Sequence, residues 1–195
     1  MEGTGRLEAF SDGVFAIAAT LLVLEFSVST GHKLDHELLH LWPAYLAYVT
    51  SFVTIGIIWI NHHHTVSLMG RTDRTMLFVN NLLLLTVAFL PFPTKLVGDY
   101  LRKDGEEAAA LAYAGTLVIM AALHQVWWQY ARRNRRLIAA GVSDAALRAV
   151  DRAYAPGVLM YGVVFVLAFF SPLAAVVLTF AIAAFYLPSA ALFDR

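Results

Sequence analysis

The chain has no cysteine among its 195 residues. Disulfides, thiolate-ligated zinc and thiol catalysis are therefore excluded. Charged residues are scarce as well. They make up 14% of the chain, whereas soluble domains carry about 25%. Fourteen basic residues balance fourteen acidic ones, so the chain lacks the basic excess that is typical of nucleic-acid-binding proteins. We therefore expect no nucleic-acid partner.

Enzyme motifs are also missing. The chain contains no His-Glu-x-x-His, no Gly-x-Ser-x-Gly and no glycine-rich phosphate loop. Three consecutive histidines, 62–64, invite comparison with haem and metalloenzyme sites. Adjacent residues of a helix point about 100° apart, however, so the three side chains cannot face one ligand. We predict that the protein is not an enzyme and uses no cofactor.

Apolar residues dominate what is present, at 59% of the chain. A helix that crosses the ~30 Å core of a bilayer needs about 20 mostly apolar residues. The last uncharged run is long enough for two such helices, and Ser171-Pro172 divides it, because the residue before proline avoids the helical region. We predict one all-α domain over residues 1–195 with six membrane-spanning helices, at about 7–28, 41–64, 75–97, 108–131, 154–171 and 173–193.

Lysine and arginine counts in the short loops predict how the chain lies in the bilayer. If the N-terminus is cytoplasmic, ten of the fourteen basic residues fall on the cytoplasmic side, including six arginines between 132 and 152. Four fall on the other side: Lys33, Lys95, Arg102 and Lys103. This asymmetry favours a multi-pass protein with both termini in the cytoplasm.

The first span has two distinct faces on a helical wheel of about 100° per residue. Small or branched residues flank its acidic residue Asp12, namely Ala16, Ala19 and Val23. We expect this face to pack closely against another helix. Nearly opposite lies a row of large apolar side chains: Phe10, Ile17, Leu21, Leu24 and Val28. Such a row either contacts lipid or a neighbouring helix, or it lines the constriction of a pore. Periodicity leaves both interpretations open.

Polar residues of the first three spans fall at one depth in this topology. They are Ser11 and Asp12 in the first span, Asn61, His62 and His63 in the second, and Asn80 and Asn81 in the third. Buried polar groups in a bilayer need partners within the protein. We therefore expect a hydrogen-bonded network of Ser11, Asp12, one of the two histidines and an asparagine. It serves either to hold the helices together or to relay protons.

The start of the first span carries a recognisable motif. Arg6-Leu-Glu-Ala-Phe10-Ser11-Asp12 resembles the signature of the transmembrane-protein-175 family of potassium channels, in its bacterial form. Trp59-Ile-Asn61-His62-His63 resembles the second-helix pattern of this family, and Asn81-Leu with Pro91-Phe-Pro-Thr94 resembles the third. The second half of the chain is similar in hydropathy only. His64 departs from the pattern, in which a basic residue is expected.

The resemblance implies a homotetramer that conducts potassium and other monovalent cations, with the first helix of each subunit lining a central pore. Ile17 would form the narrowest ring, Leu21 and Leu24 would form rings above it, and Thr20 would favour potassium. Arg6, Ser11 and Asp12 would hold this helix against the next two. A single repeat in the chain implies a bacterial plasma membrane. Because Thr-Val-Gly-Tyr-Gly is absent, we expect a hydrophobic gate without a carbonyl selectivity filter.

Three histidines precede the second span at intervals of four residues: His32, His36 and His40. A helix would place them on one face, where imidazoles at this spacing can bind zinc. The sequence leaves two interpretations open, a modulatory metal site or solvated side chains.

Two further functions stay open from the sequence. A proton-coupled transporter would use Asp12 and His62 or His63 as its titrating groups. Transporters usually contain inverted repeats and broken helices at the midplane, and we find no internal repeat. The other alternative is a structural membrane protein without transport.

Overall fold

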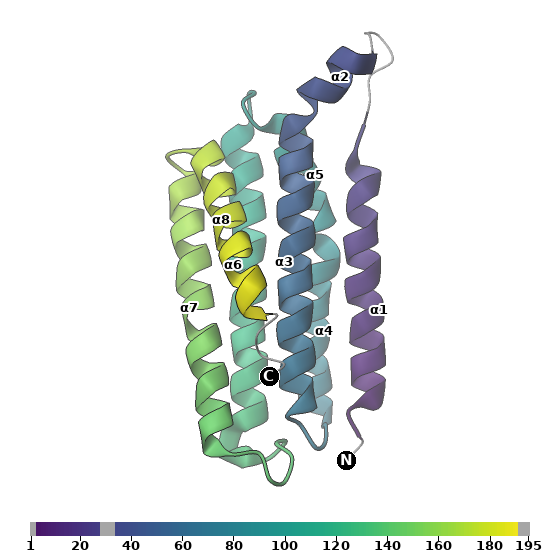
Figure 1. The fold of residues 1–195 in the computed structure, drawn as a ribbon, viewed down its shortest axis with the longest axis vertical. Coiled ribbons are helices and arrows are strands. Elements are labelled where there is room, and N and C mark those ends of the chain that lie inside the picture. Colours follow the sequence, from purple (N-terminus) through teal and green to yellow (C-terminus); the bar gives the residue numbers. More distant parts are fainter. Residues whose placement is uncertain (1–2, 28–33, 191–195) are drawn as a thin grey trace.

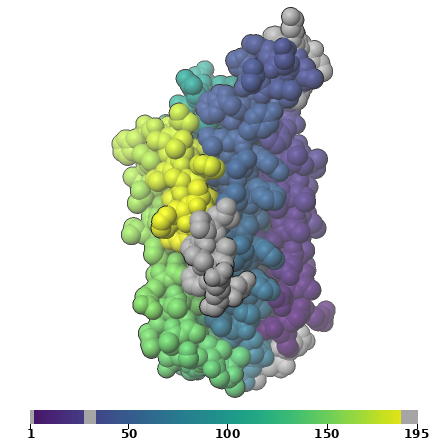
Figure 2. Space-filling model, viewed as in Figure 1, coloured from purple at the N-terminus to yellow at the C-terminus, as the bar shows by residue number. Residues whose placement is uncertain are grey.

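The computed structural model describes residues 3–27 and 34–190, and side chains as far as Tyr186. Its long helices run roughly parallel to the long axis of an elongated bundle (Figure 1). The first helix lies at one edge of the bundle and α7 at the other (Figure 1). The last helix, α8, crosses the face between α7 and α3 (Figures 1 and 2). The expected all-helical architecture is confirmed.

Five helical segments of the described chain are long and apolar enough to cross a membrane. They overlap the first five predicted spans and are Gly5–Glu25, Trp42–Ser67, Arg74–Tyr100, Glu106–Arg135 and Asp144–Ala168. The sixth predicted span overlaps α8 (Pro172–Ala190), an apolar helix whose fully described part ends at Tyr186 and is short for a membrane crossing. The number of six spans therefore stays a prediction.

The first and third predicted spans are less regular than expected. α1 (Gly5–Leu21) continues into a 3₁₀ turn, η1 (Leu22–Glu25). The third span is divided into α4 (Arg74–Phe89) and α5 (Pro91–Tyr100). Pro91 and Pro93 have no backbone N–H, so two carbonyls at the end of α4 lose their usual donors. The N–H of Leu90 instead donates to the carbonyl of Val87 at 3.2 Å, which tightens the last turn.

The fifth span begins earlier than predicted. After α6 (Glu106–Arg132) and the short η2 (Arg133–Arg135), α7 runs from Asp144 to Ala168 rather than from residue 154. Ser143 caps its first turn, because its Oγ accepts a hydrogen bond of 3.2 Å from the N–H of Ala146. The prediction placed the span in the uncharged segment alone, whereas the helix also includes amphipathic first turns that bury Leu147 and Val150. The point at which this helix enters the bilayer stays a prediction.

The face of α1 that packs within the subunit differs from the predicted one. Its buried residues are Leu7, Ser11, Phe15 and Ala18, followed by Leu22 in η1. Of the predicted residues, Ala19 is partly buried and packs against the core. Ala16 is exposed, Val23 is 53% exposed, and Asp12 lies half-buried at the edge of the packed face. Large apolar side chains remove more area from contact with solvent than alanine does. They therefore decide which side of α1 faces α3 (Trp42–Ser67) and α4.

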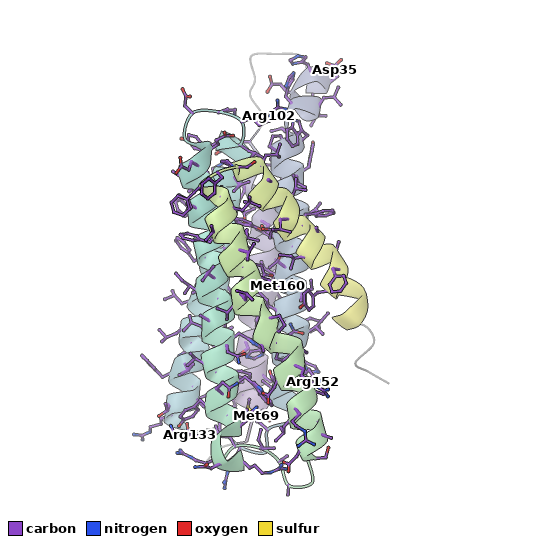
Figure 3. The ribbon with its side chains drawn as sticks, turned by 90° about the vertical axis from the view of Figure 1, so that its left-hand side faces the viewer. Asp35, Met69, Arg102, Arg133, Arg152 and Met160 are labelled. Carbon is purple, nitrogen blue, oxygen red and sulfur yellow. The ribbon has the colours of Figure 1, made fainter. Side chains whose placement is uncertain are left out.

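Arginines gather at one end of the bundle, where η2 (Arg133–Arg135) lies and Arg71 donates a hydrogen bond to the carbonyl of Arg136. Arg133, Arg152 and Met69 lie at one end, and Asp35 and Arg102 lie at the other (Figure 3). The chain begins at the end that holds Arg133 (Figures 1 and 3), which we call the arginine-rich end. This arrangement is the one that a cytoplasmic N-terminus requires. The orientation in the membrane stays a prediction.

Asp73 joins three elements at the arginine-rich end. It caps α4, because its Oδ1 accepts a 2.8 Å hydrogen bond from the N–H of Met76. The hydroxyl of Tyr130 on α6 donates to its Oδ2 at 2.9 Å, and the guanidinium of Arg136 pairs with the same oxygen. Burial raises the pKa of the Asp73 carboxyl, but these three partners outweigh burial and hold its pKa below the ordinary value of 3.8.

We expect Asp73→Ala to lower the free energy of unfolding by about 2 kcal/mol, roughly half from the lost cap and half from the lost Tyr130 bond. Because the pKa of the folded state is lowered, this contribution is complete above about pH 4 and is lost as the pH falls through the folded pKa. Thermal unfolding of the detergent-solubilised protein across pH measures both effects. Ser143→Ala, which removes a cap bond alone, should cost about 1 kcal/mol. Equal losses at pH 7 would contradict the role of Asp73 as a junction.

Candidate functional site

A row of large apolar side chains on α1 and η1 is left largely exposed by the described part of the chain. Phe10 is 60% exposed, Ile17 61%, Leu21 40% and Leu24 73%. The opposite side of α1 packs against α3 and α4, and α1 forms an edge of the molecule (Figure 2). The row therefore faces away from the rest of the subunit, as the sequence predicted for one face of this helix. Val28, the last member of the predicted row, lies outside the described residues.

Thr20 lies beside this row. Its side chain is exposed, and its Oγ1 donates a hydrogen bond of 2.9 Å to the carbonyl of Ile17 on the same helix. A hydroxyl that donates to its own backbone still has oxygen lone pairs to offer. Thr20 can therefore present an oxygen ligand on the outward side of α1.

A buried chain of hydrogen bonds connects the first three long helices. Nε2 of His62 on α3 lies 2.8 Å from Oδ1 of Asn80 on α4. Nδ2 of Asn80 donates to Oγ of Ser11 on α1 at 3.1 Å, and the hydroxyl of Ser11 donates to the carbonyl of Leu7 at 2.8 Å. Exposure is 1% for His62, 2% for Asn80 and 0% for Ser11. Polar groups that are this well shielded from water must find their hydrogen-bond partners within the protein.

Two aromatic rings pack against the His62 imidazole. The ring of Phe15 on α1 lies 5.5 Å from the imidazole, centroid to centroid. Trp127 on α6 stacks on it at 4.8 Å with an interplanar angle of 24°, and this indole is itself fully buried. The contact with Trp127 extends the buried cluster from α1 to the second half of the chain. Sequence reasoning missed Trp127, because no pattern in the sequence shows which aromatic of α6 faces α3.

Asp12 does not belong to this chain of hydrogen bonds. Its Oδ1 accepts a 2.8 Å hydrogen bond from Nε1 of Trp59 on α3. One turn earlier on α1, Oε1 of Glu8 lies 3.0 Å from Nδ1 of His63, in a partly exposed pair. These two contacts join α1 to α3 along the edge of the interface. Glu8 was missed, although its position four residues before Asp12 places both carboxylates on one side of the helix.

The remaining predicted residues lie apart from these contacts. Arg6 and Asn81 are exposed and form no ion pair or side-chain hydrogen bond with the described residues. The carbonyl of Asn61 accepts a hydrogen bond of 2.9 Å from the hydroxyl of Thr65. Asn61 also lines a cavity between α3, α6, α7 and α8, on the far side of α3 from α1. The structure thus brings together only part of the predicted set.

The predicted histidine face before the second span is partly described. α2 (Leu34–His40) is helical, and Nε2 of His36 lies 3.0 Å from Nε2 of His40. His32 lies outside the described residues. Among the residues that are described, no group of three histidine, cysteine or acidic side chains has the geometry to hold a metal ion. A metal site at this position therefore stays a prediction.

Comparison with protein families gives a match over the part of the chain that holds this site. Residues 6–91 match the family model described as endosomal/lysosomal potassium channel TMEM175. A potassium channel of Chamaesiphon minutus is 43% identical over 189 residues, which cover 94% of this chain and 93% of that protein. A potassium channel of Streptomyces collinus is 43% identical over 88% of this chain and 85% of its own length.

A solved structure matches almost the whole chain. The crystal structure of a lysosomal potassium-selective channel TMEM175 homolog from Chamaesiphon minutus superposes with a TM-score of 0.87 at 40% identity. The superposition covers 96% of this chain and 97% of that one. The likeness therefore includes the second half of the chain, where the sequence alone indicated a similarity of hydropathy.

Proposed function

The chain belongs to the TMEM175 family of potassium channels, and from this membership we propose that it conducts potassium passively through a central pore in a bacterial plasma membrane. Four identical subunits surround the pore in this proposal, and each contributes α1 to its wall. The proposal needs no cofactor, and potassium is the permeant species. Other monovalent cations are expected to pass with lower preference.

The observation that carries the pore assignment is the exposed apolar row of α1. A single helix cannot enclose a path for ions, so the row must meet copies of itself for a pore to form. Ile17, Leu21 and Leu24 would then stand in three successive rings. A ring of branched aliphatic side chains dewets a narrow path and blocks ions until it widens or hydrates. We assign the narrowest ring to Ile17.

Thr20 lies between the Ile17 and Leu21 rings in sequence. Its oxygen keeps lone pairs that can replace part of the hydration shell of a cation. We propose that this hydroxyl contributes a modest preference for potassium. Its donor is already used by the carbonyl of Ile17, which supports a role for the oxygen as an acceptor.

The contacts behind α1 would set the angle at which the row faces the pore. Ser11 is connected through Asn80 to His62, and Asp12 accepts from Trp59. These bonds lie on two sides of α1, so together they restrain its rotation about its own axis. We propose that they position the rings. A proton-coupled carrier would instead require Asp12 and the histidines to load and release protons together, and no hydrogen bond among the described residues joins Asp12 to His62 or His63.

Potassium flux from proteoliposomes tests this function. With the purified protein in potassium-loaded vesicles, we expect flux that follows the potassium gradient, and unitary current steps in planar bilayers. Saturable uptake that strictly requires a pH gradient would replace the channel with a carrier. No flux from a correctly folded protein would leave a structural role. A detergent-corrected mass should equal four subunits, and a monomeric mass would contradict a pore formed by α1.

A further inference from the structure

Two histidines share one face of α2, the short helix that projects from the bundle at the end opposite the arginine-rich end (Figures 1 and 3). His36 and His40 are both exposed, and residues four apart on a helix are neighbours on its surface. Their rings lie 4.1 Å apart, centroid to centroid, and their Nε2 atoms are 3.0 Å apart. Both nitrogens are therefore within reach of one ion from the surrounding water.

The separation of the two nitrogens is that of two adjacent ligands of a transition-metal ion. Imidazole nitrogens bind such an ion at about 2.0–2.1 Å, so two of them lie about 2.9 Å apart when the angle at the metal is about 90°, and about 3.3 Å apart at the tetrahedral angle. The observed 3.0 Å corresponds to an angle of about 94°. It is closer to the square-planar geometry of Cu²⁺ and Ni²⁺ than to the tetrahedral geometry of Zn²⁺.

A hydrogen bond between the two rings gives the same separation, and it leaves the metal site intact. Without a metal, one imidazole donates its Nε2–H to the other, and the tautomers decide which ring is the donor. A metal replaces this proton, because a ligating nitrogen must offer its lone pair. Both side chains are exposed, and the terminal torsion of histidine is broad. The rings can therefore turn toward a shared ion at little cost.

The charges of α2 favour a cation at this place. Asp35 precedes His36 and Glu37 follows it, whereas no lysine or arginine lies within Leu34–His40. Carboxylates attract a cation over about one Debye length, which is about 8 Å at physiological salt. None of the α2 residues is buried, so a hydrated ion reaches the two imidazoles from solution.

We propose that His36 and His40 form a binding site for a divalent transition-metal ion that favours square-planar nitrogen coordination, with Cu²⁺ as the representative of this class. The two Nε2 atoms occupy adjacent positions of the plane, and water fills the other positions. The site needs two protein ligands only, so it is compatible with the finding that the described residues hold no group of three. It lies apart from the α1 row and from the contacts behind it.

A bound ion would also stabilise α2 itself. The helix has seven residues, none of them buried, and a helix this short is marginal in water unless packing supports it. An ion that bridges positions four apart binds the helical conformation, so it shifts the balance between helix and coil toward the helix. We expect hydrogen exchange of the α2 backbone amides to slow when Cu²⁺ is added. Unchanged exchange at saturating Cu²⁺ would contradict this geometry.

Electron paramagnetic resonance of Cu²⁺ tests the site directly. The sample is the purified full-length protein from which any affinity tag has been removed. We expect one Cu²⁺ per subunit, with a square-planar signal that shows two nitrogen ligands in the plane. Titration calorimetry should show that Zn²⁺ binds about tenfold more weakly or less, in the order that divalent metals follow at nitrogen ligands. A signal with one nitrogen, or Zn²⁺ that binds as tightly as Cu²⁺, would overturn the proposal.

Substitutions on α2 locate the ion. His40→Leu leaves one imidazole, so we expect the affinity for Cu²⁺ to fall about a hundredfold, the gain that joining two contacts provides. The exchange variant, Leu38→His with His40→Leu, has the same composition as the wild type. Its two histidines are two residues apart and point about 200° apart on the helix. Leu38 is already 41% exposed, so the exchange disturbs no core.

We expect the exchange variant to bind Cu²⁺ no better than His40→Leu does. His64→Gln, at the far end of α3, is the control for binding to other histidines and should keep the affinity of the wild type. Wild-type affinity in the exchange variant, or a hundredfold loss in His64→Gln, would place the ion elsewhere. None of these measurements depends on ion flux, so their result and that of the conduction assay are independent.

Discussion

Ile17→Asn should raise potassium flux through the reconstituted protein by about tenfold. In the proposed pore this side chain forms the narrowest ring, and the barrier to an ion there is the absence of water between apolar walls. Asparagine is polar and of similar length, so a ring of asparagines hydrates the constriction without closing it. A tenfold gain corresponds to a barrier that is lower by about 1.4 kcal/mol. Flux from proteoliposomes or current in planar bilayers measures the effect.

The control for this variant is an isoleucine of similar exposure on another helix. Ile119 on α6 is 54% exposed, against 61% for Ile17, and lies outside α1. Ile119→Asn adds the same polar group to an apolar surface, so it reports any general leak that the substitution introduces. We expect its flux to match that of the wild type. Equal increases in both variants, or no increase in Ile17→Asn, would remove Ile17 from the gate.

Asn80→Leu should be the most destabilising of the substitutions considered. Asn80 is the central member of the buried chain, since it accepts from His62 and donates to Ser11. Leucine has a similar volume but cannot form either bond, and the His62 imidazole is left unsatisfied. Buried unpaired groups cost about 1–3 kcal/mol, and interhelical hydrogen bonds in membranes about 0.6–1.7 kcal/mol each. We therefore expect a loss of about 3 kcal/mol, seen as a lower melting temperature of the purified protein.

The neighbouring residue offers a close control. Asn81 is the same residue type on the same turn of α4, but its side chain is exposed. Asn81→Leu should change the melting temperature little or raise it slightly, because an apolar side chain is favoured on a surface that faces lipid. If the two variants melt alike, the chain through Asn80 contributes little to stability.

The polar set of the first three helices shows how far sequence reasoning reached. Depth in the predicted topology indicated that Ser11, a histidine of 62–63 and an asparagine of 80–81 would meet, and the structure places Ser11, His62 and Asn80 in contact. The same argument grouped Asp12 with them, but Asp12 bonds to Trp59 instead. Depth fixes a position along the helix axis and says nothing about rotation around it. Rotation therefore decided which members of the set meet.

The faces of α1 show the same limit. A helical wheel correctly separated the row of Ile17 and Leu21 from the side that carries Asp12. Of the residues it assigned to the packed face, Ala19 packs against the core, but Phe15 and Leu22 are buried there in place of Ala16 and Val23. A wheel gives the angles between residues on one helix. Which side of that helix faces the rest of the bundle depends on the shapes of the helices that pack against it.

The sequence by itself determined that this protein lies in a membrane, roughly where its first five long helices run, and to which family it belongs. Each of these follows from local information: the length of an apolar segment, the positions of the charges and a short motif. Only the tertiary structure decided the junction at Asp73, the stacking of Trp127 on His62 and the cavity on the far side of α3. Each depends on the rotation and spacing of helices that are far apart in the chain, and close packing in three dimensions sets both.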